Sequence, residues 1–322
     1  MTYQWRGLSL DIARNFFGPP VLKRLIDRLN DLDLNRLHLH LTDDQGWRIE
    51  IPGRPELTRE SGGTSIDGGN SGYLTVGDYA SLVEYADAKG VVIVPEVDLP
   101  GHVNAALHAC PGLNASGVAA QVRTDPEVGY SFLNVNLPQT EDFLNDVLVA
   151  LAEMTPGQWM HIGGDECPLL SNEDFGKLVS MAAGIVAETG HQPVAWQEGA
   201  LAGLGKDLVL QYWRTGDSNE PALYDALLDQ INVGADVILS PASHAYFDLR
   251  YDENDTVHQD WAGTLSVEKA SDWVPAEVLP IDPARILGVE AAIWTEFIHT
   301  PEDLDNMLLP RLEVFADIAH GD

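Results

Sequence analysis

Two adjacent carboxylates are the sharpest chemical signal in this chain. They end the run His161-Ile-Gly-Gly-Asp165-Glu166. Because neighbouring like charges raise a carboxyl pKa, one member of such a pair can stay protonated near neutral pH and donate its proton to a leaving oxygen. The paired glycines let the backbone turn tightly and approach a ligand, which a side chain would obstruct. The motif predicts acid–base chemistry, although a solvated turn could carry the same residues.

A second group of side chains could bind a neutral ligand rich in hydroxyl groups. Aromatic rings combine a large apolar surface with a polar edge, which suits the face of a sugar or an acetyl methyl. Charged groups make the stronger hydrogen bonds that distinguish ring hydroxyls. The aromatic candidates are Trp196, Trp213, Tyr246 and Trp294, and the charged candidates are Arg14, Asp248 and Glu296. Taken singly, each has a structural explanation in core packing or surface charge.

The elements that must position these residues alternate between short β-rich runs and helical stretches, which predicts a parallel sheet with crossover helices. We expect strands over 7–12, 36–41, 91–97, 159–163, 193–197, 208–213, 236–240 and 287–294. We expect helices over 20–32, 76–89, 140–154, 172–188, 220–228 and 301–319. Eight such strands predict an α/β protein built as a single (β/α)₈ TIM barrel over residues 1–322.

The candidate residues follow the ends of these predicted strands. Asp43 follows the second, Asp98 and His102 the third, and a polar or aromatic group follows each of the others. In a barrel the carboxyl ends of the strands meet on one face, which carries the active site. Three long loops rich in Gly, Asn and Asp, over 51–72, 111–135 and 244–283, are expected to build this face.

Composition limits the kinds of partner. The 322 residues contain 18 Lys and Arg against 50 Asp and Glu, a net charge of −32, which repels nucleic acid and anionic membrane surfaces. No apolar run suggests a signal peptide or a transmembrane segment, and the compartment stays unknown. Cys110 and Cys167 are too few for a disulfide framework. We expect no metal and no cofactor, and homo-oligomerisation stays open.

Together the motifs resemble glycoside hydrolase family 20, the β-N-acetylhexosaminidases, along almost the full length of the chain. Seven motifs occur in the family's order with similar spacing. They are Arg6-Gly-Leu-Ser-Leu-Asp11-Ile-Ala-Arg14, His38-Leu-His40-Leu-Thr-Asp43-Asp44-Gln-Gly-Trp47-Arg48, Pro95-Glu-Val-Asp98-Leu-Pro-Gly-His102, His161-Ile-Gly-Gly-Asp165-Glu166, Trp196-Gln-Glu198, Tyr246-Phe-Asp248 and Gly288-Val-Glu290-Ala-Ala-Ile-Trp294-Thr-Glu296.

The resemblance implies exo-acting hydrolysis of a terminal GlcNAc or GalNAc from glycans or chitooligosaccharides, by a retaining mechanism in which the substrate's own acetamide attacks C1. Glu166 would be the general acid and base. Asp165 would orient the acetamide N–H, and Tyr246 would bind the acetamide oxygen. Trp196, Trp213 and Trp294 would enclose the methyl group.

By the same resemblance, Arg14, Asp248 and Glu296 would bind the sugar hydroxyls. Asp43, Asp98 and His102 would support the acid, with His102 held by Asp98. Family members usually carry a small α/β domain before the barrel, and we expect it to be absent here because the first strand begins near Arg6. Two alternatives stay open: a lacto-N-biosidase-like enzyme that releases a disaccharide, and a non-catalytic carbohydrate-binding barrel.

Overall fold

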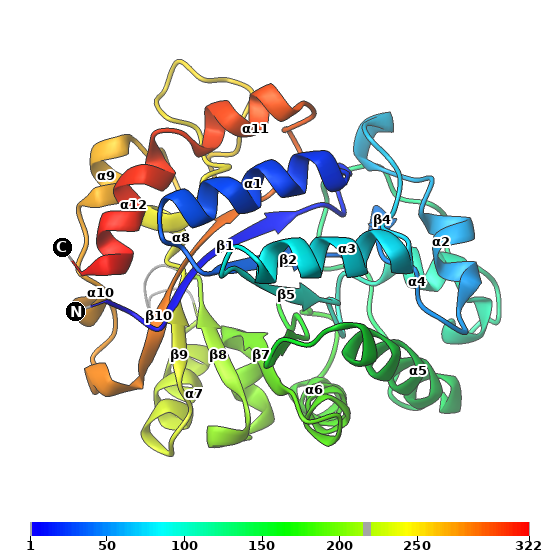
Figure 1. Ribbon diagram of the computed structural model, residues 1–322. Helices are drawn as coiled ribbons and strands as arrows, with labels where there is room; N and C mark the ends of the chain where they lie inside the picture. Colours follow the sequence, from blue (N-terminus) through cyan, green and yellow to red (C-terminus); the bar gives the residue numbers. More distant parts are fainter. Residues whose placement is uncertain (1, 215–219, 322) are drawn as a thin grey trace.

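The computed structural model describes residues 2–214 and 220–321 and contains a closed parallel barrel (Figure 1). Around the barrel the strands follow chain order, and β10 pairs with β1 to close the ring. The barrel strands are β1 (Trp5–Asp11), β2 (Arg36–His40), β5 (Val92–Glu96), β6 (Trp159–His161), β7 (Gln192–Trp196), β8 (Val209–Tyr212), β9 (Val237–Leu239) and β10 (Ile286–Ile293). The predicted TIM barrel and its eight strands are confirmed. A small antiparallel pair, β3 (Thr42–Asp43) and β4 (Gly46–Trp47), follows β2.

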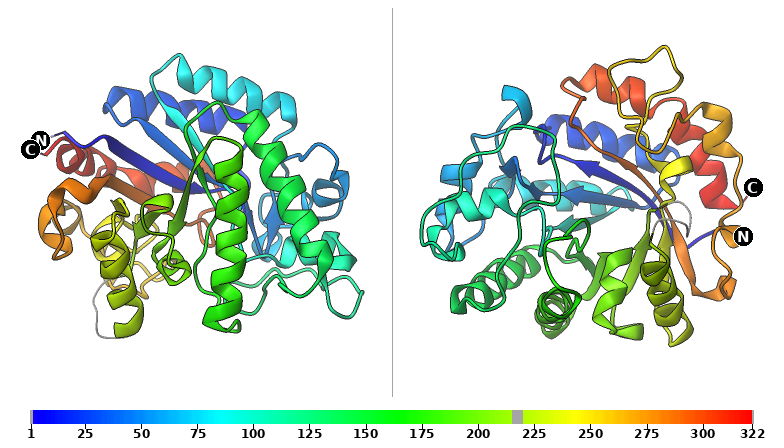
Figure 2. Two further views of the ribbon diagram at one scale, coloured as in Figure 1. Left: turned by 90° about the horizontal axis from the view of Figure 1, so that it is seen from below. Right: turned by 180° about the vertical axis from the view of Figure 1, so that it is seen from behind.

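Helices surround the barrel on its outside (Figure 2). The long ones are α1 (Pro19–Asp31), α3 (Val76–Asp87), α5 (Pro138–Met154), α6 (Asn172–Glu188), α7 (Pro221–Asn232), α11 (Pro301–Leu308) and α12 (Arg311–His320). Capping boxes start α3 at Thr75 and α11 at Thr300, where the sequence carries helix-start signals. Among the described residues, no helix has both the length and the apolar character needed to cross a membrane.

The structure corrects the predicted elements at three places. The single helix expected over 301–319 is two helices, because Pro310 lacks an N–H and its ring cannot follow a helical turn. The strand expected over 159–163 ends at His161, since Gly163 and Gly164 both have positive φ. Two of the long loops contain short helices, α2 (Pro55–Ser61) in the first and α9 (Val267–Ser271) and α10 (Pro275–Val278) in the third, while α4 (Asn104–Ala109) precedes the second loop and α8 (Ala242–Ala245) overlaps the start of the third.

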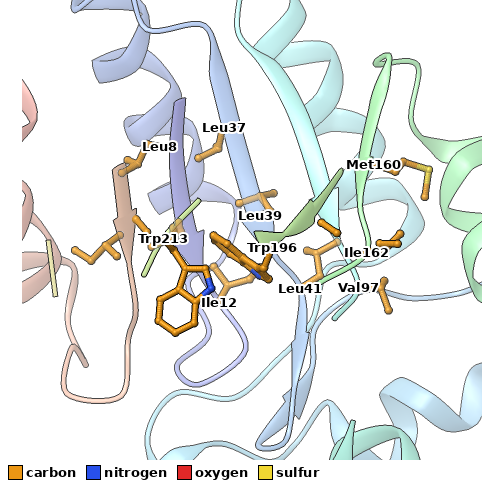
Figure 3. Packing of buried hydrophobic residues seen from close by; sticks show 14 of the residues in the cluster. Leu8, Ile12, Leu37, Leu39, Leu41, Val97, Met160, Ile162, Trp196 and Trp213 are labelled. Carbon is orange, nitrogen blue, oxygen red and sulfur yellow. The ribbon is translucent and has the colours of Figure 1, made fainter. Parts of the chain in front are cut away.

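Outward-facing strand residues form the main hydrophobic core against the helices. Leu8, Leu37 and Leu39 belong to this cluster, part of which is shown in Figure 3. Because side chains alternate along a strand, the residues between these leucines face the barrel interior. His38 and His40 occupy such positions on β2 and are fully buried.

The barrel interior is stacked in levels two residues apart. The lowest level is apolar and contains Trp5, Val94, Trp159, Val194, Val209 and Ile238. The next level is polar. We call its fully buried members His38, Glu96, His161, Gln211 and Glu290 the buried polar layer. Gly7 of β1 makes room for this layer, because a Cβ there would overlap the Glu290 carboxylate.

Arg48 joins the long loop over 51–72 to the end of β1. Its guanidinium is fully buried and donates hydrogen bonds to five backbone carbonyls, those of Ile12, Ala13, Gly62, Thr64 and Gly72. One cation therefore fixes the backbone beside Arg14 and the loop that packs against it.

The lowest level of the barrel generates a stability prediction. The rings of Trp5 and Trp159 meet edge to face with centroids 5.3 Å apart, and the Arg36 guanidinium lies over both. We expect Trp159→Ala to lower the free energy of unfolding by about 3–5 kcal/mol, because it leaves a cavity in a closed ring of strands. Urea titration measures this loss, and Trp159→Phe, which keeps a ring, should lose less. A loss below about 1 kcal/mol for the alanine variant would contradict the packing described.

Candidate active site

A cavity of about 320 Å³ opens at the carboxyl ends of the barrel strands. Its lining includes most of the residues singled out from the sequence. They are Arg14, Asp43, Asp98, His102, Asp165, Glu166, Trp213, Tyr246, Trp294 and Glu296. The carboxylates, the guanidinium and the aromatic rings therefore meet in one place although they come from seven different strand ends.

Two predicted site residues do not line this cavity. Trp196 lies lower, at the level of the buried polar layer, where its Nε1 donates to Glu96 Oε1 at 2.8 Å. Its ring centroid is 5.9 Å from that of Trp294, which covers it. Asp248 is buried and accepts a 3.3 Å hydrogen bond from the Trp294 backbone N–H. Its Oδ2 has no hydrogen-bond partner among the described residues.

Other lining residues come from two of the predicted long loops. Pro126 and Val128 lie in the loop after β5, and Gln259 and Trp261 lie in the loop after β9. Sequence reasoning placed these loops on the active-site face but did not select these residues. The third long loop, over 51–72, supports Arg14 through its backbone and does not line the cavity.

Aromatic rings form one wall of the cavity. Tyr246 lies between Trp213 and Trp294, with ring centroids 6.2 Å from each. The Trp213 Nε1 donates to Glu198 at 3.0 Å, which fixes the orientation of that indole. Trp261 extends the wall outward, 5.8 Å from both Trp213 and Tyr246, and is 53% exposed. The wall is thus buried at its inner end and open to solvent at its outer end.

The backbone after β6 presents the two adjacent carboxylates to the cavity. Gly163 has φ +70°, and a Cβ at this position would overlap the Asp98 carboxylate. Glu166 itself has φ 42°, a left-handed conformation that costs energy for any residue other than glycine. The turn therefore holds Glu166 in a strained backbone conformation and brings Asp165 close to Asp98.

His102 lies between the carboxylate pair and Asp43. Its Nδ1 is 3.2 Å from Asp43 Oδ1, and its Nε2 is 3.6 Å from Glu166 Oε2 and 3.8 Å from Asp165 Oδ2. The expectation that Asp98 holds His102 is wrong. Asp98 also lines the cavity, but it accepts from the backbone N–H of Gly164 at 3.2 Å, because the turn after β6 brings that amide to it.

Asp43 accepts hydrogen bonds or ion pairs from four donors. His40 Nε2 and Arg14 Nη2 are each 2.9 Å from Oδ2, while His102 and the backbone N–H of Asp44 bond to Oδ1. Burial would raise the pKa of Asp43, but the charges of Arg14 and His102 hold it well below its usual range. This carboxylate is therefore an anion that fixes one nitrogen of His102.

Protonation differs among the carboxyl groups of the site. Burial and the charge of Asp165 raise the pKa of Asp98 well above its usual value. Burial also raises the pKa of Asp165, and Glu166 adds to this increase against the opposing charge of His102. For Glu166 burial acts in the same direction, but the hydrogen bond and charge of His102 outweigh it and lower the pKa. The member of the adjacent pair with the raised pKa is thus Asp165.

The charges around His102 favour its protonated form. Burial alone would lower the pKa of this imidazole, yet Asp43 and Asp165 hold it well above its usual value. In the free site the proton nearest to Glu166 is therefore on His102.

Several groups of His, Asp and Glu side chains among the described residues lie close enough to share a metal ion. In one of them, His40, Glu96 and Asp98, both imidazole nitrogens already bond to carboxylates, at 2.7 and 2.9 Å. In another, His102 is bonded to Asp43 in the same way. These groups are paired with one another as ion pairs, as buried charges require.

Comparison with known proteins agrees with this architecture. The chain matches the model of "Glycosyl hydrolase family 20, catalytic domain" over residues 3–177 and 171–320. It is 46% identical over 319 residues to a β-N-acetylhexosaminidase of Cellulomonas fimi, covering 98% of this chain and 63% of the relative. It is 32% identical over 350 residues to a β-hexosaminidase of Vibrio furnissii, covering 98% of this chain and 56% of that protein. The chain thus spans less than two thirds of the length of these relatives.

Solved structures give the same result. A family 20 β-N-acetylhexosaminidase of Streptomyces coelicolor superposes with a TM-score of 0.96 at 39% identity, covering 99% of this chain and 64% of that one. A mutant β-hexosaminidase of Streptomyces plicatus, solved with the product GlcNAc, superposes with a TM-score of 0.95 at 40% identity over the same shares. The family model matches nearly the whole length of this chain, which therefore belongs to glycosyl hydrolase family 20.

Proposed function

We propose that this chain is an exo-acting β-N-acetylhexosaminidase that removes a terminal non-reducing GlcNAc or GalNAc from glycans or chitooligosaccharides with retention of configuration. The observation that carries the proposal is the placement of Asp165 and Glu166 around one imidazole, beside a buried aromatic wall. Such a site offers an acid, an anion and an apolar pocket to one sugar. This combination suits a substrate whose acetamide takes part in the reaction.

In this mechanism the acetamide oxygen attacks C1 as the glycosidic bond breaks. The attack forms an oxazolinium ion, which water then opens to give the retained product. Asp165 accepts the acetamide N–H and stabilises the positive charge that develops there, while Tyr246 donates to the acetamide oxygen. Trp213 and Trp294 enclose the methyl group, and Trp196 supports them from below.

Glu166 transfers protons in both steps. It is 31% exposed in the free site, so an aglycone that covers it removes water and raises its pKa. The proton on His102, 3.6 Å away, is then the nearest source for protonating Glu166. Glu166 gives this proton to the glycosidic oxygen and later removes one from the attacking water.

The inner end of the cavity binds the terminal sugar hydroxyls. Arg14 is held by Asp43 and Asp11, and its guanidinium lies 5.2 Å from the ring centroid of Trp294. Glu296 Oε2 and Asp248 Oδ2 are buried atoms with no hydrogen-bond partner among the described residues. Because an unpaired buried polar atom costs about 1–3 kcal/mol, a ligand hydroxyl would favourably satisfy Glu296, which lines the cavity. Arg14 and Glu296 at this end offer the hydrogen bonds that a terminal sugar requires, which supports exo action.

Replacing the acid tests the function. We expect Glu166→Gln to lower kcat for chitobiose by about 10²- to 10⁴-fold, the usual contribution of a general acid, with KM changed little. Glu188→Gln, an equivalent change at the exposed end of α6, should leave both constants unchanged. Steady-state release of GlcNAc measures these rates.

Two outcomes would count against this function. A folded wild-type protein that binds GlcNAc without cleaving chitobiose would favour a non-catalytic barrel. Release of an intact disaccharide from a longer glycan, without release of GlcNAc from chitobiose, would favour a lacto-N-biosidase-like activity.

The buried carboxyl group of Asp248 predicts a pH effect on stability. Burial and the charge of Glu296 raise its pKa to about 8. The folded state therefore binds a proton that the unfolded state releases at a lower pH, so this group lowers stability progressively as pH rises from about 4 to about 8. We expect Asp248→Asn, which mimics the neutral acid, to gain stability relative to the wild type as pH rises from about 5 to above about 8. Thermal unfolding at both pH values measures this, and an equal stability difference at both would contradict it.

A further inference from the structure

Glu96 is a fully buried carboxylate that does not line the cavity. It lies at the end of β5, in the buried polar layer, and receives hydrogen bonds from two directions. Oε1 accepts from Trp196 Nε1 at 2.8 Å and lies 3.1 Å from His161 Nδ1. Oε2 lies 2.7 Å from His40 Nδ1 and 3.0 Å from His38 Nε2. The Glu96 carboxylate thus holds both the Trp196 indole, which lies below the aromatic wall, and the His40 imidazole.

His40 connects Glu96 to the acid. Its Nδ1 bonds to Glu96, and its Nε2 bonds to Asp43 Oδ2 at 2.9 Å. Asp43 in turn binds His102, whose Nε2 lies 3.6 Å from Glu166. Carboxylates and imidazoles therefore alternate from Glu96 to Glu166, joined by hydrogen bonds as far as His102 and by a 3.6 Å approach between His102 Nε2 and Glu166. His40 uses its two nitrogens on two different carboxylates, whereas His102 bonds to Asp43 through Nδ1 and turns Nε2 toward both Asp165 and Glu166.

The series is charged along its length. Burial would lower the pKa of His40, but Glu96 and Asp43 hold it well above its usual value. Burial would likewise raise the pKa of Glu96, yet His40, His161 and His38 hold it well below its usual range. Buried charges of this kind are stable only while each has its partner, so loss of one member weakens the next.

We propose that Glu96 and His40 are positioning residues for the acid: they fix Asp43 so that it holds His102 against Glu166. This rests on the function proposed above, in which Glu166 protonates the leaving oxygen. Neither residue touches the cavity, so neither meets the substrate. Their effect should therefore appear only in steps that depend on the proton held between His102 and Glu166.

Leaving groups distinguish this role from a loss of stability. A 2,4-dinitrophenyl glycoside has a leaving group acidic enough to depart without a proton, whereas a methyl glycoside requires the acid. Misplacement of the acid therefore slows the methyl substrate more than the dinitrophenyl substrate. A smaller folded fraction, or a looser aromatic wall around the acetamide, slows both by the same factor.

The matched variants are Glu96→Gln and Glu290→Gln. Both change a fully buried glutamate of the buried polar layer, and Glu290 bonds to Trp5, His38 and Gln211 but not to His40 or Trp196. We expect kcat/KM of Glu96→Gln for methyl β-GlcNAc to fall roughly tenfold or more beyond its fall for the dinitrophenyl β-GlcNAc. Glu290 reaches Glu96 only indirectly, through His38, whose Nε2 lies 3.0 Å from Glu96 Oε2, so for Glu290→Gln the two substrates should change by more nearly the same factor than for Glu96→Gln.

His40→Gln provides a second variant should Glu96→Gln fail to fold, because a glutamine cannot bridge two carboxylates as a charged imidazole does. It should show the same selective loss. Equal losses on both substrates in Glu96→Gln and His40→Gln, or the same selective loss in Glu290→Gln, would overturn the inference. Cleavage of both substrates by the wild-type protein tests the proposed function separately, so its failure is recognised before any variant is compared.

Discussion

Burial of ionised groups inside the barrel is the constraint on which the rest of this structure depends. A carboxylate removed from water is stable only when several donors replace its hydration. Asp43 meets this requirement with four donors. Glu96 meets it with hydrogen bonds from Trp196 and His40 and with two further imidazole nitrogens, of His161 and His38, within 3.1 Å. Those donors come from different strands, so the strands must be placed accurately before either charge is tolerated. The closed barrel supplies that placement.

The same constraint explains why the levels of the barrel differ in polarity. The lowest level is apolar and joins the strands by packing, led by Trp5 and Trp159. The buried polar layer above it replaces packing by hydrogen bonds and fixes the orientation of Trp196 and His40. The cavity then lies on a rigid polar base. A rigid base suits a mechanism in which an acetamide and an acid must be held in register within fractions of an ångström.

The sequence was sufficient for the architecture and for most of the site, because both follow from local rules. Alternation of β-rich and helical runs predicts the barrel, and the carboxyl ends of strands predict where the reactive groups gather. The partner of His102 could not be derived in this way. Asp98 is near His102 in the chain, but Asp43 is closer in space because β2 and β5 are neighbours.

Other features of the site that the sequence did not predict have similar physical causes. The loop residues Trp261 and Val128 reach the cavity through loop conformations that no periodic pattern specifies. The depth of Trp196 depends on where its residue lies along β7. The lowered pKa of Glu166 and the raised pKa of Asp165 depend on burial and on the charge of His102. These features arise from contacts between distant segments, so spacing along the chain does not reveal them.

The proposed mechanism depends on attack of the substrate's own acetamide on C1, and comparison of two sugars tests this step. The measurement is the hydrolysis rate of 4-nitrophenyl β-GlcNAc beside 4-nitrophenyl β-glucoside, which carries a hydroxyl in place of the acetamide. The account predicts cleavage of the GlcNAc compound and a rate at least about 10³-fold lower for the glucoside, because the intramolecular nucleophile is missing. Comparable rates for the two sugars would contradict it and would require a nucleophile from the protein.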